Sequence, residues 1–162
     1  MRRQTCFALV LAALAGPALA LSCLRPDVVR TYQSAAAAEE AYVVVQGTLD
    51  FDGRRLPKAD ASDRADTPPS TRIPARITGQ ALTRTGFDQT FDREITLDLL
   101  CFGPWCAGAK SGIPYLAFLR KTDTGYVLQL DPCGGFGFAE PTGEMLTRVE
   151  GCYRGRACKP AR

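Results

Sequence analysis

The 162-residue sequence contains no histidine, and this absence narrows the chemistry that is open to the chain. Ser-His-Asp triads and Cys-His pairs cannot be built without an imidazole ring. Histidine is also a common zinc ligand, and the cysteines present do not form paired C-x-x-C knuckles. We therefore predict that the protein is not an enzyme, that it has no metal site and that it needs no cofactor.

A long apolar run is also missing. The best candidate covers residues 7–14, follows two arginines and precedes small residues at 18–20. This run is too short for a membrane span, which needs roughly 20 residues, and its three-part pattern is typical of a secretory signal peptide. We predict that residues 1–20 form a signal peptide with cleavage after residue 20 or after Ser22, an uncleaved anchor being the alternative. No transmembrane segment is expected in the mature chain.

Neither sign of charge dominates the composition. The chain has 20 Lys and Arg against 17 Asp and Glu, and two of the arginines lie in the predicted signal peptide. Such a balance provides no broad positive field, so we expect no nucleic-acid partner. The basic residues are concentrated near the C-terminus, where we interpret them as a solvated basic tail: Arg148, Arg154, Arg156, Lys159 and Arg162.

Of the seven cysteines, Cys6 lies in the predicted signal peptide and leaves six for the mature chain. An even number of cysteines in an exported protein indicates disulfides, so we predict three bridges and a periplasmic or extracellular location. The disulfide candidates are Cys23, Cys101, Cys106, Cys133, Cys152 and Cys158. Sequence alone does not select their pairing. Four residues separate Cys101 from Cys106, which favours a structural loop closure over a C-x-x-C redox centre.

Apolar periodicity predicts five strands between two helices. The expected strands cover residues 42–49, 73–81, 95–99, 115–119 and 126–130. The expected helices cover residues 26–38 and 141–150, the second with Thr142 as its cap and Gly151 as its stop. Five strands of this kind suit a small closed barrel. We predict a mainly β fold with one or two short flanking helices, a five-stranded OB-like barrel stapled by disulfides, as a single domain over 21–162.

Two local features qualify the first strand and the segment after it. Gly47 lies inside the strand and predicts a bulge or a sharp bend there. Residues 52–71 are rich in proline and charge and predict a mobile surface loop. Asp50 and Asp52 would share one face of a strand, but we interpret them as a solvated turn in preference to a weak Ca²⁺ site.

The order of these features resembles the netrin-like (NTR) domain, which is shared with the tissue inhibitors of metalloproteinases. The matching features are Cys23, the helix after it, the strand at 41–47, the segment 112–119, Cys133 and a helix at 144–150. The resemblance spans about residues 23–150. It implies an OB-like barrel whose N-terminal segment is tied by a disulfide to Cys133 or to the 101–106 loop.

The resemblance also implies a mechanism, because such inhibitors chelate the zinc of a protease through the amine and carbonyl of an N-terminal cysteine. Cleavage after Ser22 would place Cys23 at that position, followed by Leu24 and Arg25. Those inhibitors begin Cys-x-Cys, whereas position 25 here is arginine. Because a shared fold does not carry function, we predict first an exported binding or interaction module for an unidentified protein or small ligand. A metalloprotease inhibitor that binds a zinc protease through Cys23 and a structural cell-envelope protein are the alternatives.

An aromatic and basic surface is a further candidate interaction site. OB-folds bind single-stranded nucleic acid on such surfaces, and Tyr115 and Phe118 with Arg76 and Arg84 would supply the residue types. We predict instead that Tyr115 and Phe118 belong to the core. The surfaces left for a partner are the 52–71 loop, the 101–112 loop and the basic tail.

Overall fold

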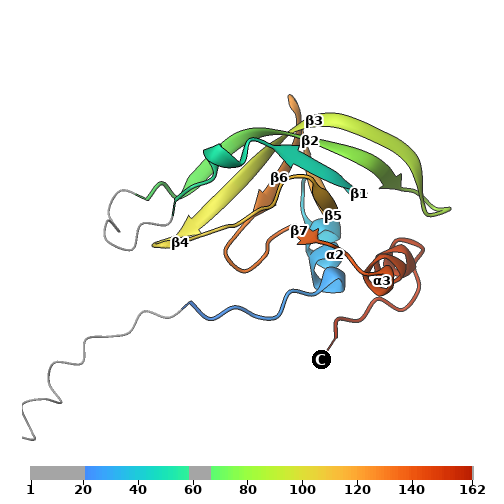
Figure 1. The fold of residues 1–162 in the computed structure, drawn as a ribbon. Coiled ribbons are helices and arrows are strands. Elements are labelled where there is room, and N and C mark those ends of the chain that lie inside the picture. The colour runs from blue at the N-terminus through green and yellow to red at the C-terminus, as the bar shows by residue number, and fades with distance from the viewer. Residues whose placement is uncertain (1–20, 59–66, 162) are drawn as a thin grey trace, which may run out of the picture.

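The structure is a computed structural model that describes residues 21–58 and 67–161 (Figure 1). The predicted signal peptide and the middle of the predicted 52–71 loop lie outside these residues. The elements follow in the order α2 (Val28–Ala37), β1 (Tyr42–Phe51), the 3-10 turn η2 (Gly53–Arg55), β2 (Ser70–Leu82), β3 (Phe87–Phe102), β4 (Trp105–Cys106), β5 (Ile113–Thr122), β6 (Gly125–Leu130), β7 (Gly137–Ala139) and α3 (Gly143–Tyr153). The five predicted strands and both helices are present, and the short β4 and β7 were not predicted.

The five long strands close into a ring. Strand β1 pairs antiparallel with β2 on one side and with β5 on the other. Strand β2 continues to β3, β3 pairs in parallel with β6, and β6 returns to β5. This order confirms the predicted mainly β, OB-like fold class, with two short helices outside the ring.

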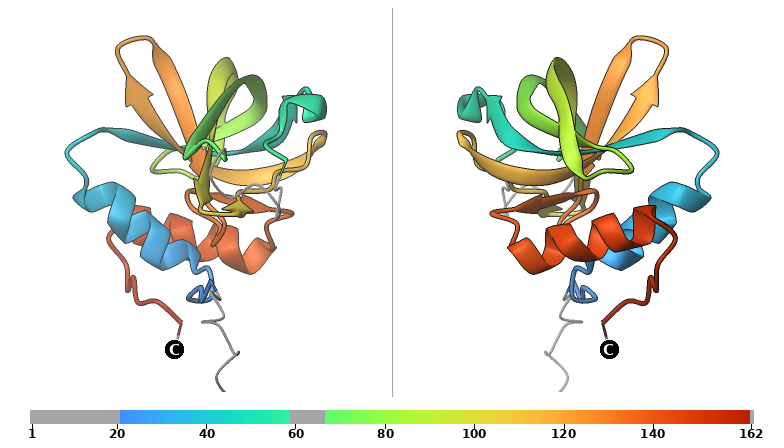
Figure 2. Two further views of the ribbon diagram at one scale, coloured as in Figure 1. Left: turned by 90° about the vertical axis from the view of Figure 1, so that its left-hand side faces the viewer. Right: turned by 90° about the vertical axis from the view of Figure 1, so that its right-hand side faces the viewer.

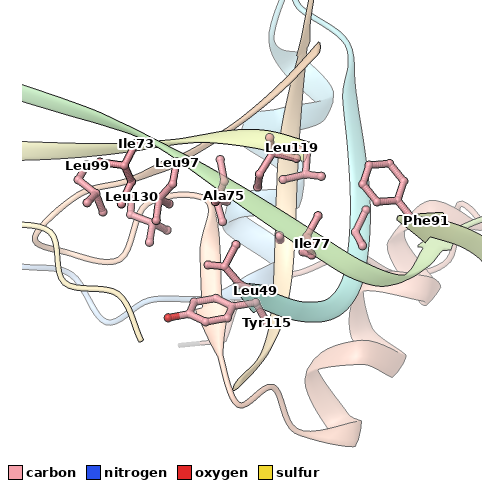
Figure 3. Packing of buried hydrophobic residues seen from close by; sticks show 14 of the residues in the cluster. Leu49, Ile73, Ala75, Ile77, Phe91, Leu97, Leu99, Tyr115, Leu119 and Leu130 are labelled. Atoms are coloured by element: carbon pink, nitrogen blue, oxygen red, sulfur yellow. The ribbon is translucent and has the colours of Figure 1, made fainter. Parts of the chain in front are cut away.

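Two apolar layers stabilise this arrangement. The first fills the ring with alternate residues of its strands (Figure 3), and its fully buried members include Leu49, Ile77, Leu97, Leu99, Leu119 and Leu128. The second layer lies between the ring and the helices and includes Val28, Val29, Leu116, Phe118, Phe138 and Val149. Figure 2 shows α2 and α3 next to each other on this side of the ring. Burial of each large apolar side chain contributes about 1.5–3 kcal/mol.

Both helices begin at a side-chain cap, and their boundaries differ slightly from the prediction. Asp27 is the N-cap of α2, one position before the first turn, and accepts hydrogen bonds from the N–H groups of Val29 and Arg30. Thr142 caps α3 as predicted. The predicted stop at Gly151 is wrong, because α3 continues to Tyr153 and ends near Gly155. That glycine has φ 73° and its N–H bonds to the carbonyl of Cys152.

Three disulfides join all six cysteines of the described residues, as predicted. Cys23 pairs with Cys133 across 110 residues, which ties the N-terminal segment to the end of the β5–β6 hairpin. The other two bridges are local: Cys101–Cys106 closes the β3–β4 turn, and Cys152–Cys158 fixes the chain after α3. A bridge over a long loop restricts the unfolded chain most, so Cys23–Cys133 is the one expected to stabilise the fold most.

Some strand boundaries extend beyond the prediction. Strand β2 begins at Ser70, so the predicted 52–71 loop reaches two residues too far. Strand β3 begins at Phe87, because polar residues pair with β2 well before the apolar segment at 95–99. Within the described ranges, no helix is both long enough and apolar enough to cross a membrane.

Gly47 does not form the predicted bulge, because β1 keeps a regular register with both of its neighbours. Its Cα lies opposite Gly79 of β2, and the two backbones approach closely. A Cβ at Gly79 would lie 2.1 Å from the carbonyl oxygen of Gln46, and one at Gly47 would lie 2.6 Å from that of Thr78. The glycine pair therefore permits the strand contact on which ring closure depends.

This contact makes Gly79 a sensitive position. We expect Gly79→Ala to lower the free energy of unfolding by about 2 kcal/mol or more, because rigid backbone has to move to admit the methyl group. Gly53→Ala is the matched control, since a Cβ there meets nothing within 4 Å, and its effect should stay within about 0.5 kcal/mol. Urea unfolding of the two oxidised variants measures both values, and equal stability of the two would contradict this account.

Candidate functional site

A hollow of about 940 Å³ is lined by β1, β2 and β3 and by the turn between β5 and β6. We call it the strand groove. Its polar and aromatic lining residues are Asp50, Phe51, Arg72, Arg76, Glu94, Thr96, Ser111, Thr122, Thr124 and Tyr126. They come from β1, β2, β3, the segment before β5 and the β5–β6 hairpin, which rises beside β2 and β3 in Figure 2.

Strand alternation places the groove's charges on the outer face. In β2, Ile73 and Ala75 are buried inside the ring while Arg72 and Arg76 are exposed. Register then sets Arg76 between Asp50 of β1 and Glu94 of β3. These alternating charges form a surface with cations and carboxylates side by side.

Arg76 is held by a specific ion pair. Its Nη2 lies 2.8 Å from Oδ1 of Asp92, which also accepts a hydrogen bond from Oγ1 of Thr78. The hydrogen bond from Arg76 is the main reason that the pKa of Asp92 lies below its usual value, and the same bond raises the pKa of Arg76. Both side chains are about half exposed, so the pair orients the guanidinium more than it stabilises the fold.

Arg72 is held differently, by a buried carboxylate. Asp98 is 2% exposed and is the one buried charged residue of the described chain. Its Oδ1 accepts a hydrogen bond from Ser70 Oγ at 2.5 Å, and its Oδ2 accepts one from Gln129 Nε2 at 3.2 Å. Arg72 Nε lies 3.8 Å from Oδ1 while 70% of its side chain stays exposed. The buried carboxylate thus lies close to a cation that remains accessible at the groove.

The N-terminal ridge, which we define as Cys23, Leu24 and Arg25, is a second candidate site. All three residues are exposed, and Leu24 is 78% exposed, which is unusual for a large apolar side chain held by a disulfide next to it. The ridge borders a hollow of about 370 Å³ that Phe136 and Asp131 also line.

Asp27 lies two residues after the ridge and anchors the chain there. Its Oδ2 accepts a hydrogen bond from Arg148 Nη2 of α3 at 3.2 Å and another from the backbone N–H of Ala161 at 3.1 Å. Burial by itself would raise the pKa of Asp27, but the backbone hydrogen bonds from Arg30 and Ala161 and the charge of Arg148 outweigh it. The pKa therefore lies below its usual value. One carboxylate thereby joins α2, α3 and the C-terminal segment.

A lowered pKa makes this carboxylate a source of pH-dependent stability. Its contribution is complete above the pKa of the unfolded chain, about 3.9, and is lost as the pH falls through the lower folded value. We expect Asp27→Asn, which keeps a capping oxygen, to cost about 1–2 kcal/mol at pH 7. The difference from the wild type should shrink as the pH falls from 5 towards 2. Urea unfolding across this range tests this.

The matched control is Asp123→Asn, since Asp123 is exposed in the β5–β6 turn. Its stability curve should follow the wild-type curve throughout. If Asp27→Asn also ran parallel to the wild type down to pH 2, the ionised Asp27 would not be the group that links these elements.

The aromatic and basic surface considered for nucleic acid does not exist as such. Tyr115 is 3% exposed and Phe118 is 0% exposed, so the prediction that both belong to the core is confirmed. The Tyr115 hydroxyl accepts a hydrogen bond from the N–H of Lys110. Arg84 lies in the β2–β3 turn, where its carbonyl accepts a hydrogen bond from Arg154 Nε.

The structure also separates the two aspartates at the end of β1. Asp50 lines the strand groove, whereas Asp52 follows the strand, caps η2 and forms a salt bridge with Arg54 at 2.9 Å. In residues 21–58 and 67–161, no three His, Cys, Asp or Glu side chains form a group suited to a metal ion.

The predicted solvated basic tail is partly wrong. Arg148 lies on α3 and bonds to Asp27 and to the carbonyl of Lys159. Arg154 bonds to the carbonyls of Arg84 and Thr85 and holds the β2–β3 turn against α3. These two arginines join elements of the fold. Arg162 lies outside the described residues.

Sequence reasoning singled out Arg76 but missed Arg72, Glu94 and Asp98. The available signal was the alternation of polar and apolar residues in 70–77 and 92–99, which marks an outward face. This signal does not show that the face is hollowed, because the neighbouring wall comes from the β5–β6 turn, far along the chain.

No family model matches the chain, and a comparison with curated proteins gives no significant match. The resemblance to netrin-like domains stays a prediction.

Proposed function

We propose that the protein is an exported binding module and that the strand groove is its ligand site. The observation that carries the proposal is the pair of exposed cations at the groove: Arg76 is ion-paired with Asp92 at 2.8 Å, and Arg72 lies 3.8 Å from the buried Asp98. A buried carboxylate with three polar partners is costly to maintain in a fold. A role in presenting Arg72 to a ligand accounts for that cost. The three disulfides support a periplasmic or extracellular location.

The charges indicate an extended ligand of mixed sign. Arg72 and Arg76 are four residues apart on one face of β2, a spacing of roughly 13 Å. Asp50 and Glu94 flank Arg76, so cationic and anionic groups of a ligand would both find partners. The hydroxyls of Thr122, Thr124 and Ser111 add hydrogen-bonding groups along the groove. An exported polypeptide segment has this combination of length and polarity.

A site-specific photo-cross-linker tests the proposal. We expect benzoylphenylalanine at Thr124, in the groove wall, to form a defined adduct in an extract of the producing organism's exported proteins. The same group at Thr147, on the exposed side of α3, should form none. Unlabelled wild-type protein should suppress the adduct, and the double variant Arg72→Gln/Arg76→Gln should need at least about tenfold more, since interface charges contribute on this scale.

Thermal unfolding of the double variant checks that the fold is intact. Equal labelling at the two positions, or equal competition by wild type and double variant, would show that the groove is not the ligand site.

A second candidate function is inhibition of a zinc protease through the N-terminal ridge. It is favoured by one observation: Cys23 is exposed and is tied to the ring by the Cys23–Cys133 disulfide. The side chain of Leu24, next to Cys23, is 78% exposed. This arrangement would present the amine of a chain beginning at Cys23. The other bridges do not reach the ridge, so a single disulfide would hold it.

Two forms of the protein decide this candidate. Oxidised protein that begins at Cys23 should slow a panel of zinc endopeptidases at micromolar concentration, because its free amine can bind the zinc ion. Protein that keeps Leu21 and Ser22 should be inactive, since its amine is displaced from Cys23. Acetylating the Cys23 amine should abolish inhibition as well. No inhibition by the first form would eliminate this candidate and leave the groove proposal unaffected.

A further inference from the structure

A separate hollow of about 530 Å³ lies on the helical side of the ring. We call it the tyrosine pocket. It is lined by the second half of α2, the start of β1, the end of β2 and the last residue of α3. Neither the strand groove nor the N-terminal ridge contributes a residue to it. Its function, if it has a ligand, is independent of the function proposed above.

Aromatic rings gather at this pocket. Three of the five tyrosines of the chain line it: Tyr32, Tyr42 and Tyr153. Tyr42 is fixed from the other side, because its ring stacks on Phe136 with a centroid distance of 5.2 Å and an interplanar angle of 26°. Small side chains also line the pocket: Ala35, Ala36, Ala38, Ala41 and Ala81.

The hydroxyls of Tyr32 and Tyr42 are uncharged at neutral pH. Burial raises the pKa of Tyr32, and the neighbouring Tyr153 raises it further. Burial also raises the pKa of Tyr42, with a further contribution from Glu40 and an opposing one from the charge of Arg120. The rings therefore act as neutral aromatic surfaces, with no phenolate to alter the charge of the pocket.

The formal charge of the lining is entirely negative. Glu39 and Glu40 line the pocket, and its described lining residues include no lysine or arginine. Arg120 is a cation beside this lining, and its Nη1 lies 3.9 Å from Oε1 of Glu40. That distance is at the limit of an ion pair, and Glu40 is 53% exposed, so the pairing is weak. Glu39 adds a second exposed carboxylate.

We propose that the tyrosine pocket binds a small organic ammonium ion, preferably a quaternary one. Aromatic rings attract such cations through their quadrupoles, and nearby carboxylates add a long-range attraction. A quaternary ammonium carries no N–H donor, so aromatic rings and nearby carboxylates suffice to hold it, and the lining supplies both. A strongly hydrated metal ion would lack ligands there, because only two carboxylates are present.

Choline is a suitable probe, and its neutral carbon isostere 3,3-dimethyl-1-butanol is the matched control. Isothermal titration of the oxidised protein should show choline binding, with the isostere at least tenfold weaker because it has the same shape without the charge. Equal binding of the two compounds, or no detectable binding of choline at about 10 mM, would overturn the proposal.

Variants assign the effect to the pocket. Tyr153 is 42% exposed, so replacing it should leave the fold intact. We expect Tyr153→Phe to bind choline as the wild type does, and Tyr153→Leu to bind at least about threefold more weakly, because only the leucine removes the ring. Glu39→Gln should weaken binding by a similar factor. Glu144→Gln, at the opposite end of α3, should have no effect.

Chemical shifts of the backbone amides give an independent readout. Choline should perturb residues 32–44 and leave the strand groove unchanged. Equal weakening by Tyr153→Phe and Tyr153→Leu, or shifts centred outside the tyrosine pocket, would show that the cation binds elsewhere.

Discussion

Strand β1 is paired along both of its edges, and the rest of the structure depends on that double pairing. It meets β2 over residues 45–51 and β5 over residues 42–49, and so closes the ring. The close approach of Gly47 to Gly79 permits the contact with β2, since any larger side chain would meet backbone atoms. A closed ring has an interior and an exterior, and the inner apolar layer exists because β1 joins the two halves of the sheet.

Closure also gives the outside of the ring two different sides. On one side, apolar residues such as Phe118 and Leu116 face outward and are covered by α2 and α3. On the other side the outward residues are charged and line the strand groove. Asp27 and the Cys23–Cys133 bridge hold the helical side together, because they join segments from both ends of the described chain. The candidate sites are therefore surfaces of one rigid scaffold.

The buried Asp98 connects stability with the proposed function. A buried charged group costs free energy unless its partners satisfy it; here Ser70 and Gln129 donate hydrogen bonds to Asp98, and Arg72 lies nearby. Ser70 and Arg72 belong to β2, and Gln129 belongs to β6. At the groove, the ion pair with Asp92 orders Arg76 in the absence of a ligand, so less side-chain freedom is lost on binding. In the tyrosine pocket, stacking on Phe136 likewise orders the ring of Tyr42 before a ligand binds.

Local patterns in the sequence were sufficient to predict the five long strands and both helices, but not β4, β7 or every boundary. The alternation at residues 73–81 and the apolar run at 115–119 define strands whichever neighbours they pair with, because side-chain period is a property of the backbone. The even number of cysteines outside the predicted signal peptide likewise indicated that disulfides form, and Thr142 determined where α3 begins. The tertiary structure alone decided which outward face became a groove and which was covered by helices. It also decided that Arg148 and Arg154 support the fold, and that Gly47 needs to lie opposite Gly79. These outcomes depend on contacts between residues 30 or more apart in the chain, and no local pattern encodes which distant residues will meet.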